Sequence, residues 1–441
     1  MKKIIAVTLV FALMSAGFSC GKKNDSSSQP DGDTQEDILT ETELKVALID
    51  GGSGKLEPSL AEFDTANKDI TLNITHYENT DTNYSEAFNQ LTREMLSDNS
   101  PDVIIAPCEG IVNLQRSGYL TDLTPFINNS DTIDITDLLP NVRAAVDCNG
   151  AIPYLFPCFQ YTTYTASADF IDSGYENWTF EEAMAFYENL EDKKQFPQSA
   201  DMWHYFLRKA GCSSIDFDSS TCDFSGSFKQ TIDFLLQFPI DLQNDLDYKE
   251  VSSDYMDSLN IMGISGINKF AASEIYSRYN GEAMTYVGYP SADNDGAFVS
   301  VPHLWAIPEY SMNKDAAWQL IENYFRLSEQ KKMSIEYVSG VPVTESGLQA
   351  LAYDTPSVIG MSIRGDLSQW NGGEEPMQIT DEAVEKLLDY SRNVKIELRY
   401  GAKLDAMIMN EWAEVMRGNI SADECVQNLN NKVGLYLSER S

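Results

Sequence analysis

The stretch that decides the fold runs from Gly288 to Phe325 and reads GYPSADNDGAFVSVPHLWAIPEYSMNKDAAWQLIENYF. It begins with a Gly/Pro-rich loop and continues through apolar, β-prone residues from Val299 to Ile307. Ser311 to Asp315 is then expected to cap a helix, because apolar residues follow at helical spacing, namely Ala316, Ala317, Leu320, Ile321, Tyr324 and Phe325. The stretch therefore predicts a buried strand that leads into an amphipathic helix.

Length and composition limit what the rest of the chain can be. The 441 residues are too many for one ordinary core, which favours about two domains, and 43% hydrophobic with 11% aromatic residues indicates a globular protein. The 68 acidic against 31 basic residues give a formal charge of −37. This charge argues against nucleic acid or anionic lipid as the main partner and favours a neutral or cationic ligand. Most of the acids are expected simply to solvate the surface.

The N-terminus has the pattern of a targeting segment. Lys2 and Lys3 form a positive region, Ile4 to Met14 is apolar, and Ser19-Cys20 follows where cleavage occurs. The pattern is typical of a bacterial lipoprotein signal, in which Cys20 is lipidated, and an ordinary cleaved signal peptide is the alternative. The polar residues that follow, up to residue 43, predict a disordered tether. No later run of 18 apolar residues predicts a membrane span.

Removal of Cys20 from the seven cysteines leaves six. Cys212 and Cys222 flank the stretch SSIDFDSST, whose alternation around a Ser/Asp turn predicts a hairpin and a disulfide between the two. The other four, Cys108, Cys148, Cys158 and Cys425, are expected to be small buried hydrophobes. None has the spacing of a metal site, and no metal or cofactor is predicted.

Strands and helices alternate in the first part of the mature chain. Strands are expected at 44–49, 70–77 and 103–106, with helices at 58–66 and 85–97. The turn DGGSGK at 50–55 lacks the spacing of a phosphate or dinucleotide loop. Its small residues either let a ligand approach the start of the next helix or form a plain tight turn. Ser53 and Lys55 are candidate ligand contacts on the first reading.

The middle and the tail of the chain are mostly helical by pattern. Pro153 and Pro157 restrict the backbone of 150–164, where an aromatic-rich segment could connect two lobes. Thr179 is expected to cap a helix at 178–190, and Ser421 with Glu424 forms a capping box for the last helix. Further helices are predicted at 225–238, 252–260, 380–393 and 404–416, and a strand at 261–266.

Several strings resemble those of one protein family in their order and spacing. They are SPDVII, SGYLTDLTPFI, GAIPYLFPCFQYTTY, NWTFEEA, the opening stretch at 288–325 and the ending GNISADECVQNLNNKVGLYLSE. Together they resemble the sugar-binding (family 1) group of extracellular solute-binding proteins of bacterial ABC importers, over nearly all of the chain after residue 44. The resemblance implies an α/β, two-lobe periplasmic-binding-protein-like fold with hinge crossovers and a mostly helical second lobe.

The resemblance also implies domain boundaries. Residues 1–20 are the signal peptide and 21–43 the tether. The first lobe is expected at 44–155 and 298–342, and the second lobe at 156–297 and 343–441.

Ligand contacts follow from the resemblance residue by residue. Glu109 comes directly after the strand VIIAPC, at the end of a parallel sheet where α/β proteins bind ligands, although it could be an ordinary surface acid. Gln160 lies in the crossover, and Trp370 lies in a tail loop where it could stack on a sugar or pack in a core. Asn268 stands where many relatives have the Trp of a Gly-Pro-Trp turn. Tyr77, Phe159 and Ser265 complete the candidates.

The predicted function is capture of a small solute, a sugar or oligosaccharide by resemblance, and its delivery to an ABC permease. The protein is expected to act as a lipid-anchored monomer on the extracellular face of the membrane. No enzyme is predicted, because His76, His204 and His303 occur in no catalytic motif. A secreted carbohydrate-active hydrolase remains the alternative, since 68 acids guarantee chance carboxylate pairs.

Overall fold

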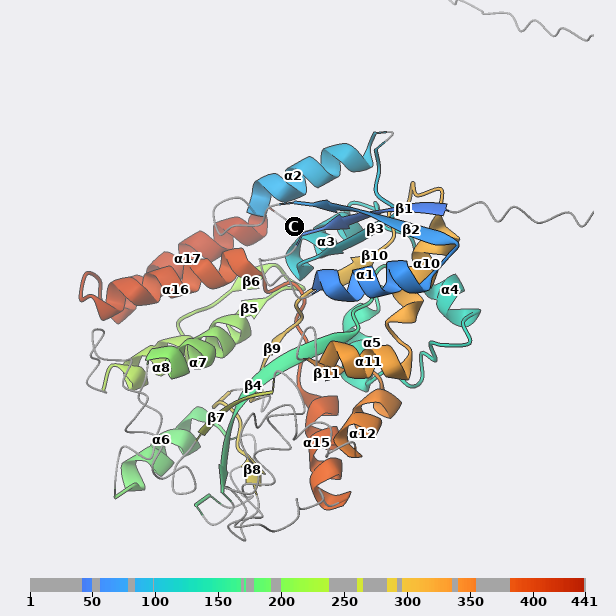
Figure 1. The fold of residues 1–441 in the computed structure, drawn as a ribbon. Coiled ribbons are helices and arrows are strands. Elements are labelled where there is room, and N and C mark those ends of the chain that lie inside the picture. Colours follow the sequence, from blue (N-terminus) through green and yellow to red (C-terminus); the bar gives the residue numbers. More distant parts are fainter. Residues whose placement is uncertain are drawn as a thin grey trace, which may run out of the picture. The chain divides into compact units, whose positions relative to one another are not determined.

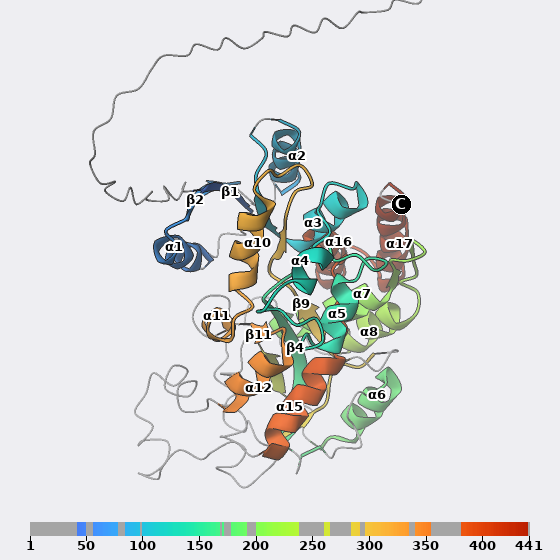
Figure 2. The ribbon, with the colours of Figure 1, turned by 90° about the vertical axis from the view of Figure 1, so that its right-hand side faces the viewer.

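The computed structural model describes residues 42–49, 56–77, 84–97, 99–167, 170–171, 178–191, 200–237, 260–264, 284–291, 296–334, 340–353 and 381–439. Residues 41–441 form one structural unit by their contacts. Within it the described residues build two larger sheets and one two-stranded hairpin, with helices packed around them (Figures 1 and 2). Among the described residues, no helix has the length and apolar character needed to cross a membrane.

The first sheet has the strand order β10-β3-β1-β2. Strands β1 (Thr42–Leu48), β2 (Ile70–His76) and β3 (Val103–Ala106) run parallel, and β10 (Leu304–Ala306) pairs antiparallel with β3. All four residues of β3 are buried, as expected for a central strand of a sheet covered on both faces. The helices that follow these strands are α1 (Leu56–Ala66), α2 (Tyr84–Met95), α3 (Cys108–Arg116) and α10 (Lys314–Asn323).

The second sheet is built on one long strand, β4 (Cys158–Ser167). Four strands pair antiparallel with it, namely β7 (Asn260–Ile264), β8 (Met284–Tyr286), β9 (Phe298–Ser300) and β11 (Val341–Pro342). Because successive side chains of a strand point to opposite faces, β4 contributes to two cores. Tyr161 is buried in the first core and Tyr164 in the second.

The two cores define the two lobes. The first core surrounds the first sheet and receives α4 (Thr124–Asn128), α5 (Pro140–Val146) and Met333, which follows α11 (Leu327–Lys332). The second core is formed mainly by α6 (Phe180–Asn189), α7 (Ala200–Ser213), α8 (Ser227–Leu235), α16 (Ala402–Met416) and α17 (Ala422–Ser438). Two helices bury their apolar faces in the first core, namely α12 (Glu345–Tyr353) and α15 (Asp381–Asn393). The domain boundaries expected from the sequence place both helices in the second lobe. Figures 1 and 2 show these two helices side by side below β11.

The prediction of one strand at 299–307 is wrong, because this segment contains two strands. β9 pairs with β4 in the second sheet, whereas β10 pairs with β3 in the first. Pro302 lies between them and has no N–H to donate, so it cannot continue a sheet ladder. The apolar run therefore passes from one sheet to the other, and the helix that follows begins at Lys314, as the pattern indicated.

The caps predicted at Thr179 and Ser421 are confirmed, whereas α10 has Asn313 as its N-cap and no side-chain cap hydrogen bond. The hydroxyl of Thr179 accepts from the backbone N–H of Glu182 at 3.2 Å, and the Glu182 carboxylate accepts from the backbone N–H of Thr179 at 2.7 Å. Ser421 and Glu424 make the same reciprocal pair at 3.2 and 2.8 Å. These boxes satisfy N–H groups that have no partner within the helix, so they set where α6 and α17 begin.

The prediction of a disulfide between Cys212 and Cys222 is wrong for this structure, because both are free cysteines. The hairpin itself is present, with β5 (Ile215–Asp216) and β6 (Thr221–Cys222) paired antiparallel. Its register places Ile215 opposite Cys222, while Cys212 lies in the last turn of α7. The Cys222 thiol instead points to the backbone carbonyl of Asn430 in α17, at 3.8 Å.

Candidate functional site

Within the described residues, three chain segments connect the two lobes. The first is β4, the second joins β9 to β10, and the third runs from the end of α15 to the start of α16. In the third, Leu398 packs in the first core and Leu404 in the second. Three short crossovers form a hinge, about which two packed bodies can rotate while their interiors stay intact. A ligand site between the lobes is expected beside these segments.

Glu109 lies in the first turn of α3, directly after the carboxyl end of β3, where the sequence predicted a ligand contact. It is only 6% exposed, which is unusual for a carboxylate. The hydroxyl of Tyr436 in α17 donates to its Oε1. Gly401, at the start of α16, packs so closely that a Cβ there would lie 2.3 Å from the Glu109 Oε2. Glu109 is therefore enclosed by second-lobe residues.

A pocket adjoins Glu109 between the lobes. Its first-lobe wall is α3, with Val112, Asn113 and Arg116, and its other wall contains Phe217, Arg399, Leu404, Tyr436 and Leu437. The space for water amounts to about 40 Å³. In this arrangement the pocket holds only a few water molecules.

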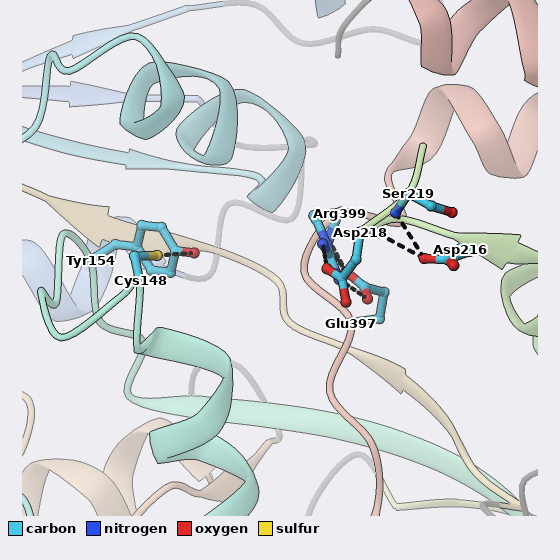
Figure 3. A network of polar contacts seen from close by, with 7 residues as sticks. All are labelled: Cys148, Tyr154, Asp216, Asp218, Ser219, Glu397 and Arg399. Atoms are coloured by element: carbon cyan, nitrogen blue, oxygen red, sulfur yellow. Dashed lines mark hydrogen bonds and ion pairs between the residues drawn. The ribbon is translucent and has the colours of Figure 1, made fainter. Parts of the chain in front are cut away.

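Arg399 lies at the edge of this pocket and makes several polar contacts there (Figure 3). Its guanidinium donates to both carboxylate oxygens of Glu397 at 2.8 and 2.9 Å and to Asp218 at 2.6 Å. It also lies 5.1 Å from the centroid of the Phe217 ring. The hydrogen bonds with Glu397, and then that with Asp218, raise the pKa of Arg399, so it stays charged. The third crossover is thus tied to the β5–β6 hairpin.

The hairpin turn is shaped to present Asp218. The Asp216 carboxylate accepts from the backbone N–H groups of Asp218 and Ser219, each at 3.0 Å (Figure 3). The hydrogen bonds from Ser219 and Asp218 lower the pKa of Asp216. This fixed turn directs the neighbouring carboxylate toward Arg399.

A second polar group lies where α7 meets α16. Arg208 donates to both oxygens of Asp405, and the hydroxyl of Tyr400 also donates to Asp405 at 3.2 Å. The Tyr400 ring meets Phe298 edge-on at 5.9 Å, and Phe298 lies 6.3 Å from Tyr205. Sequence reasoning missed these residues, because Arg208 and Asp405 are 197 positions apart and neither belongs to a motif.

The structure does not bring the other described candidates to Glu109. Tyr77 is buried and its hydroxyl donates to Glu94 of α2 at 2.5 Å. Phe159 is fully buried in the first core, where its ring lies 6.1 Å from Tyr161. Gln160 is half-buried on β4, opposite Ser300. Of these three, only Gln160 has the exposure expected of a cleft residue.

The remaining candidates lie outside the described residues. They are Ser53, Lys55, Ser265, Asn268, Trp370 and the lipidation candidate Cys20. Within the described ranges, no group of three or more His, Cys, Asp or Glu side chains is arranged to hold a metal ion. The arrangement around Glu109 offers hydrogen bonding and charge.

Solved structures share this fold at low sequence identity. The sugar-binding protein MalE from Xanthomonas citri superposes with a TM-score of 0.56 at 17% identity, over 90% of this chain and 98% of that one. A family 1 extracellular solute-binding protein from Alicyclobacillus acidocaldarius gives 0.56 at 13% identity, over 90% and 98%. A periplasmic oligogalacturonide-binding protein from Yersinia enterocolitica gives 0.55 at 14%, over 90% and 100%. The two-lobe periplasmic-binding-protein-like fold is the predicted one.

No curated protein sequence matches this chain. The family model described as "bacterial extracellular solute-binding protein" does match, over residues 59–355, which is more than half of the chain. That span runs from α1 to just beyond α12, and so includes Glu109, β4 and two of the three crossovers. The chain therefore belongs to the bacterial extracellular solute-binding protein family.

Proposed function

We propose that the protein captures a neutral sugar or oligosaccharide between its lobes and delivers it to an ABC permease. The observation that carries the proposal is the place of Glu109, at the carboxyl end of β3 and facing α16 and α17 of the second lobe. Open α/β sheets bind ligands at this end of their strands. A buried carboxylate there is a strong acceptor for solute hydroxyl groups.

Aromatic side chains beside the crossovers also support a sugar as the ligand. Tyr205, Phe298 and Tyr400 form a row of aromatic rings, and such rings suit the apolar C–H faces of a sugar. Among the proteins of the same fold, the Xanthomonas citri protein is described as sugar-binding and the Yersinia enterocolitica protein as oligogalacturonide-binding. The formal charge of −37 favours the neutral over the acidic members of this ligand class.

Ligand contacts are proposed at Glu109 and Gln160 and, from the sequence alone, at Ser53, Lys55, Ser265, Asn268 and Trp370. Tyr77 and Phe159 are not proposed again, because their side chains are committed to Glu94 and to the first core. Closure on the solute rotates the lobes about the three crossovers. The closed form then presents both lobes to the permease, which is a population shift and not a reaction. The solute is expected to be released unchanged.

The protein is proposed to work as a monomer on the extracellular face of the membrane. Lipid on Cys20 would anchor it, and the polar residues 21–43 would hold the lobes away from the bilayer. Two lobes that close on a solute from either side need no second copy to complete the site.

A thermal-shift screen tests the proposal. The purified mature protein is heated with neutral oligosaccharides, acidic oligosaccharides, polyols and short peptides, each in turn. A ligand at about 100 times its dissociation constant stabilises the folded state by about 2.7 kcal/mol, which is a measurable rise in melting temperature. A rise with neutral sugars, and their recovery intact by chromatography, is expected. A rise with peptides alone, or hydrolysis of the added sugar, would refute it.

A further inference from the structure

The carboxylate of Glu109 is already occupied by a group from the opposite lobe. The Tyr436 hydroxyl donates to its Oε1. Tyr436 is a member of the second core, whereas the neighbours of Glu109 on α3, Ile111 and Leu114, are members of the first. This hydrogen bond therefore crosses from one lobe to the other without passing through a crossover segment.

Tyr436 is held firmly in this position. Its side chain is only 6% exposed, like that of Glu109. The ammonium of Lys403, in the first turn of α16, lies 5.1 Å from the centroid of the Tyr436 ring, which is the geometry of a cation–π contact. The hydroxyl group is thus presented to Glu109 by a ring that both its own core and a neighbouring cation fix in place.

The second oxygen of Glu109 meets the start of α16. Gly401 is the N-cap of this 15-residue helix. A Cβ on Gly401 would lie 2.3 Å from the Glu109 Oε2 and 2.6 Å from the Glu109 Cβ, so only glycine allows this approach. A carboxylate at a helix N-terminus is favoured by the helix dipole. The second lobe therefore provides Glu109 with a hydroxyl donor and a favourable electrostatic environment.

The space beside this contact is too small for a solute. The adjoining pocket has about 40 Å³ of room for water, enough for a few water molecules and not for a sugar ring. A solute hydroxyl can reach the Glu109 carboxylate only after Tyr436 and Gly401 have moved away from it. The lobes are therefore in contact here in a way that solute binding has to break.

We propose that Tyr436 is an internal competitor for the solute and so a determinant of its affinity. The inference rests on the proposed function. The phenol hydroxyl takes on Glu109 the place that a solute hydroxyl takes when bound, and it holds the two lobes together while no solute is present. Because only the fraction of molecules with this contact open can bind, the contact raises the apparent dissociation constant. A solute that supplies hydroxyl donors replaces the lost hydrogen bond, and one without them does not.

The first test needs no solute. Small-angle X-ray scattering compares the ligand-free mature protein with the Tyr436→Phe variant, which keeps the ring and removes only the hydroxyl. The Tyr310→Phe variant is the matched control, since Tyr310 is 59% exposed. The radius of gyration is expected to rise in Tyr436→Phe and to stay unchanged in the control. Gly401→Ala, whose added Cβ drives the lobes apart by a different route, is expected to raise it as well.

The second test measures affinity by titration calorimetry, with maltotriose as the first probe and then the sugar that gives the largest thermal shift. Tyr436→Phe is expected to bind about 3- to 10-fold more tightly than the wild type, as loss of one competing hydrogen bond predicts. Weaker binding would overturn the proposal, because it would make Tyr436 a solute contact. An unchanged radius of gyration would also overturn it. If the variants open but no sugar binds to any of them, the proposed function is what fails.

Discussion

Arg208 in α7 donates to both carboxylate oxygens of Asp405 in α16, at 2.8 and 2.9 Å. The pair joins two helices of the second lobe, and Tyr400 adds a third donor to the same carboxylate. The two side chains are 29% and 22% exposed, so the charges are partly withdrawn from water. Gly211 lies against Ile408 a turn further along, so closely that a Cβ there would come within 2.6 Å of it. The polar pair therefore lies beside tight apolar packing.

Asp405→Asn is expected to lower the free energy of unfolding by about 1 to 3 kcal/mol, because it leaves the guanidinium of Arg208 without its paired charge. Urea denaturation at neutral pH measures this. The matched control is Asp423→Asn, which removes a carboxylate that is 88% exposed and pairs with Lys229 at 3.2 Å. The control is expected to change stability by less than about 0.5 kcal/mol. Equal losses in the two variants would contradict the prediction.

The carboxylate of Asp122 is expected to make a contribution to the free energy of unfolding that is lost in acid. It accepts from the backbone N–H and hydroxyl of Thr124 and from the backbone N–H of Ile152, which joins two loops. Partial burial by itself raises the pKa of Asp122, but the hydrogen bonds from Thr124 and Ile152 outweigh it and lower the pKa below 3.8. A lowered pKa in the folded state gives stability that is present above the unfolded pKa and is lost as the pH falls through the folded pKa.

Asp122→Asn is therefore expected to be less stable than the wild type at pH 7, with a difference that narrows as the pH falls below about 3.8. Urea denaturation at pH 7, 4 and 3 measures the difference. A gap between the two proteins that stays constant over this range would show that the charge of Asp122 does not contribute.

Cys212 and Cys222 are expected to be free thiols in the exported protein. Burial, and then the nearby charge of Asp223, raises the pKa of the Cys222 thiol, so it reacts slowly in the native state. Alkylation in urea without reductant, followed by mass spectrometry, is expected to label both residues. Dithiothreitol is expected to leave the melting temperature unchanged. Detection of a Cys212–Cys222 cross-linked peptide would show that the hairpin adopts another register in solution.

Local patterns were sufficient for most helices and strands of the described part of the chain. The strand predicted at 103–106 and the caps at Thr179 and Ser421 have the predicted bounds or partners, because each depends on residues within a few positions of one another. The split of 299–307 could not be read from its apolar pattern alone. That pattern reports low exposure, and it runs through the half-buried β9 and the buried β10 without a break, although the two strands belong to different sheets.

The candidate site was predicted less completely, because its contacts join residues that are far apart in the sequence. Glu109 could be found because it directly follows a strand. Tyr436 had no such signal, since a tyrosine at a helical core spacing ordinarily indicates packing, and its partner lies 327 positions away. Nor could the register that places Ile215 opposite Cys222 be predicted, because one residue more or less in the turn changes which side chains face each other.

Lipidation at Cys20 is a prediction of the N-terminal pattern. Inhibition of lipoprotein signal-peptide cleavage is expected to leave the uncleaved precursor in the membrane fraction, whereas Cys20→Ala is expected to remove the site of lipid attachment. Mass spectrometry of the mature N-terminus should find a lipid-modified Cys20, and Ser19→Ala serves as the control that leaves the modified residue in place. An unmodified N-terminus in the membrane fraction would count against the anchor.

The last prediction concerns the solute contacts themselves. Glu109→Gln keeps the shape of the side chain, and its amide oxygen can still accept from Tyr436, but the charge is lost. Gln160→Ala removes a polar group from β4, and Trp370→Ala removes a proposed stacking face. Each is expected to weaken binding of the sugar found in the thermal screen by about 1 to 3 kcal/mol in titration calorimetry.

Melting temperatures of the three variants distinguish a lost solute contact from a loss of folding stability. Each is expected to unfold cooperatively near the melting temperature of the wild type, and Glu109 and Gln160 contribute no apolar side chain to either core. Tyr77→Phe is the control, because the Tyr77 hydroxyl is engaged by Glu94 and lies apart from the pocket at Glu109. That variant is expected to bind the sugar as the wild type does. Unchanged affinity in Glu109→Gln, Gln160→Ala and Trp370→Ala together would mean that other residues line the cleft.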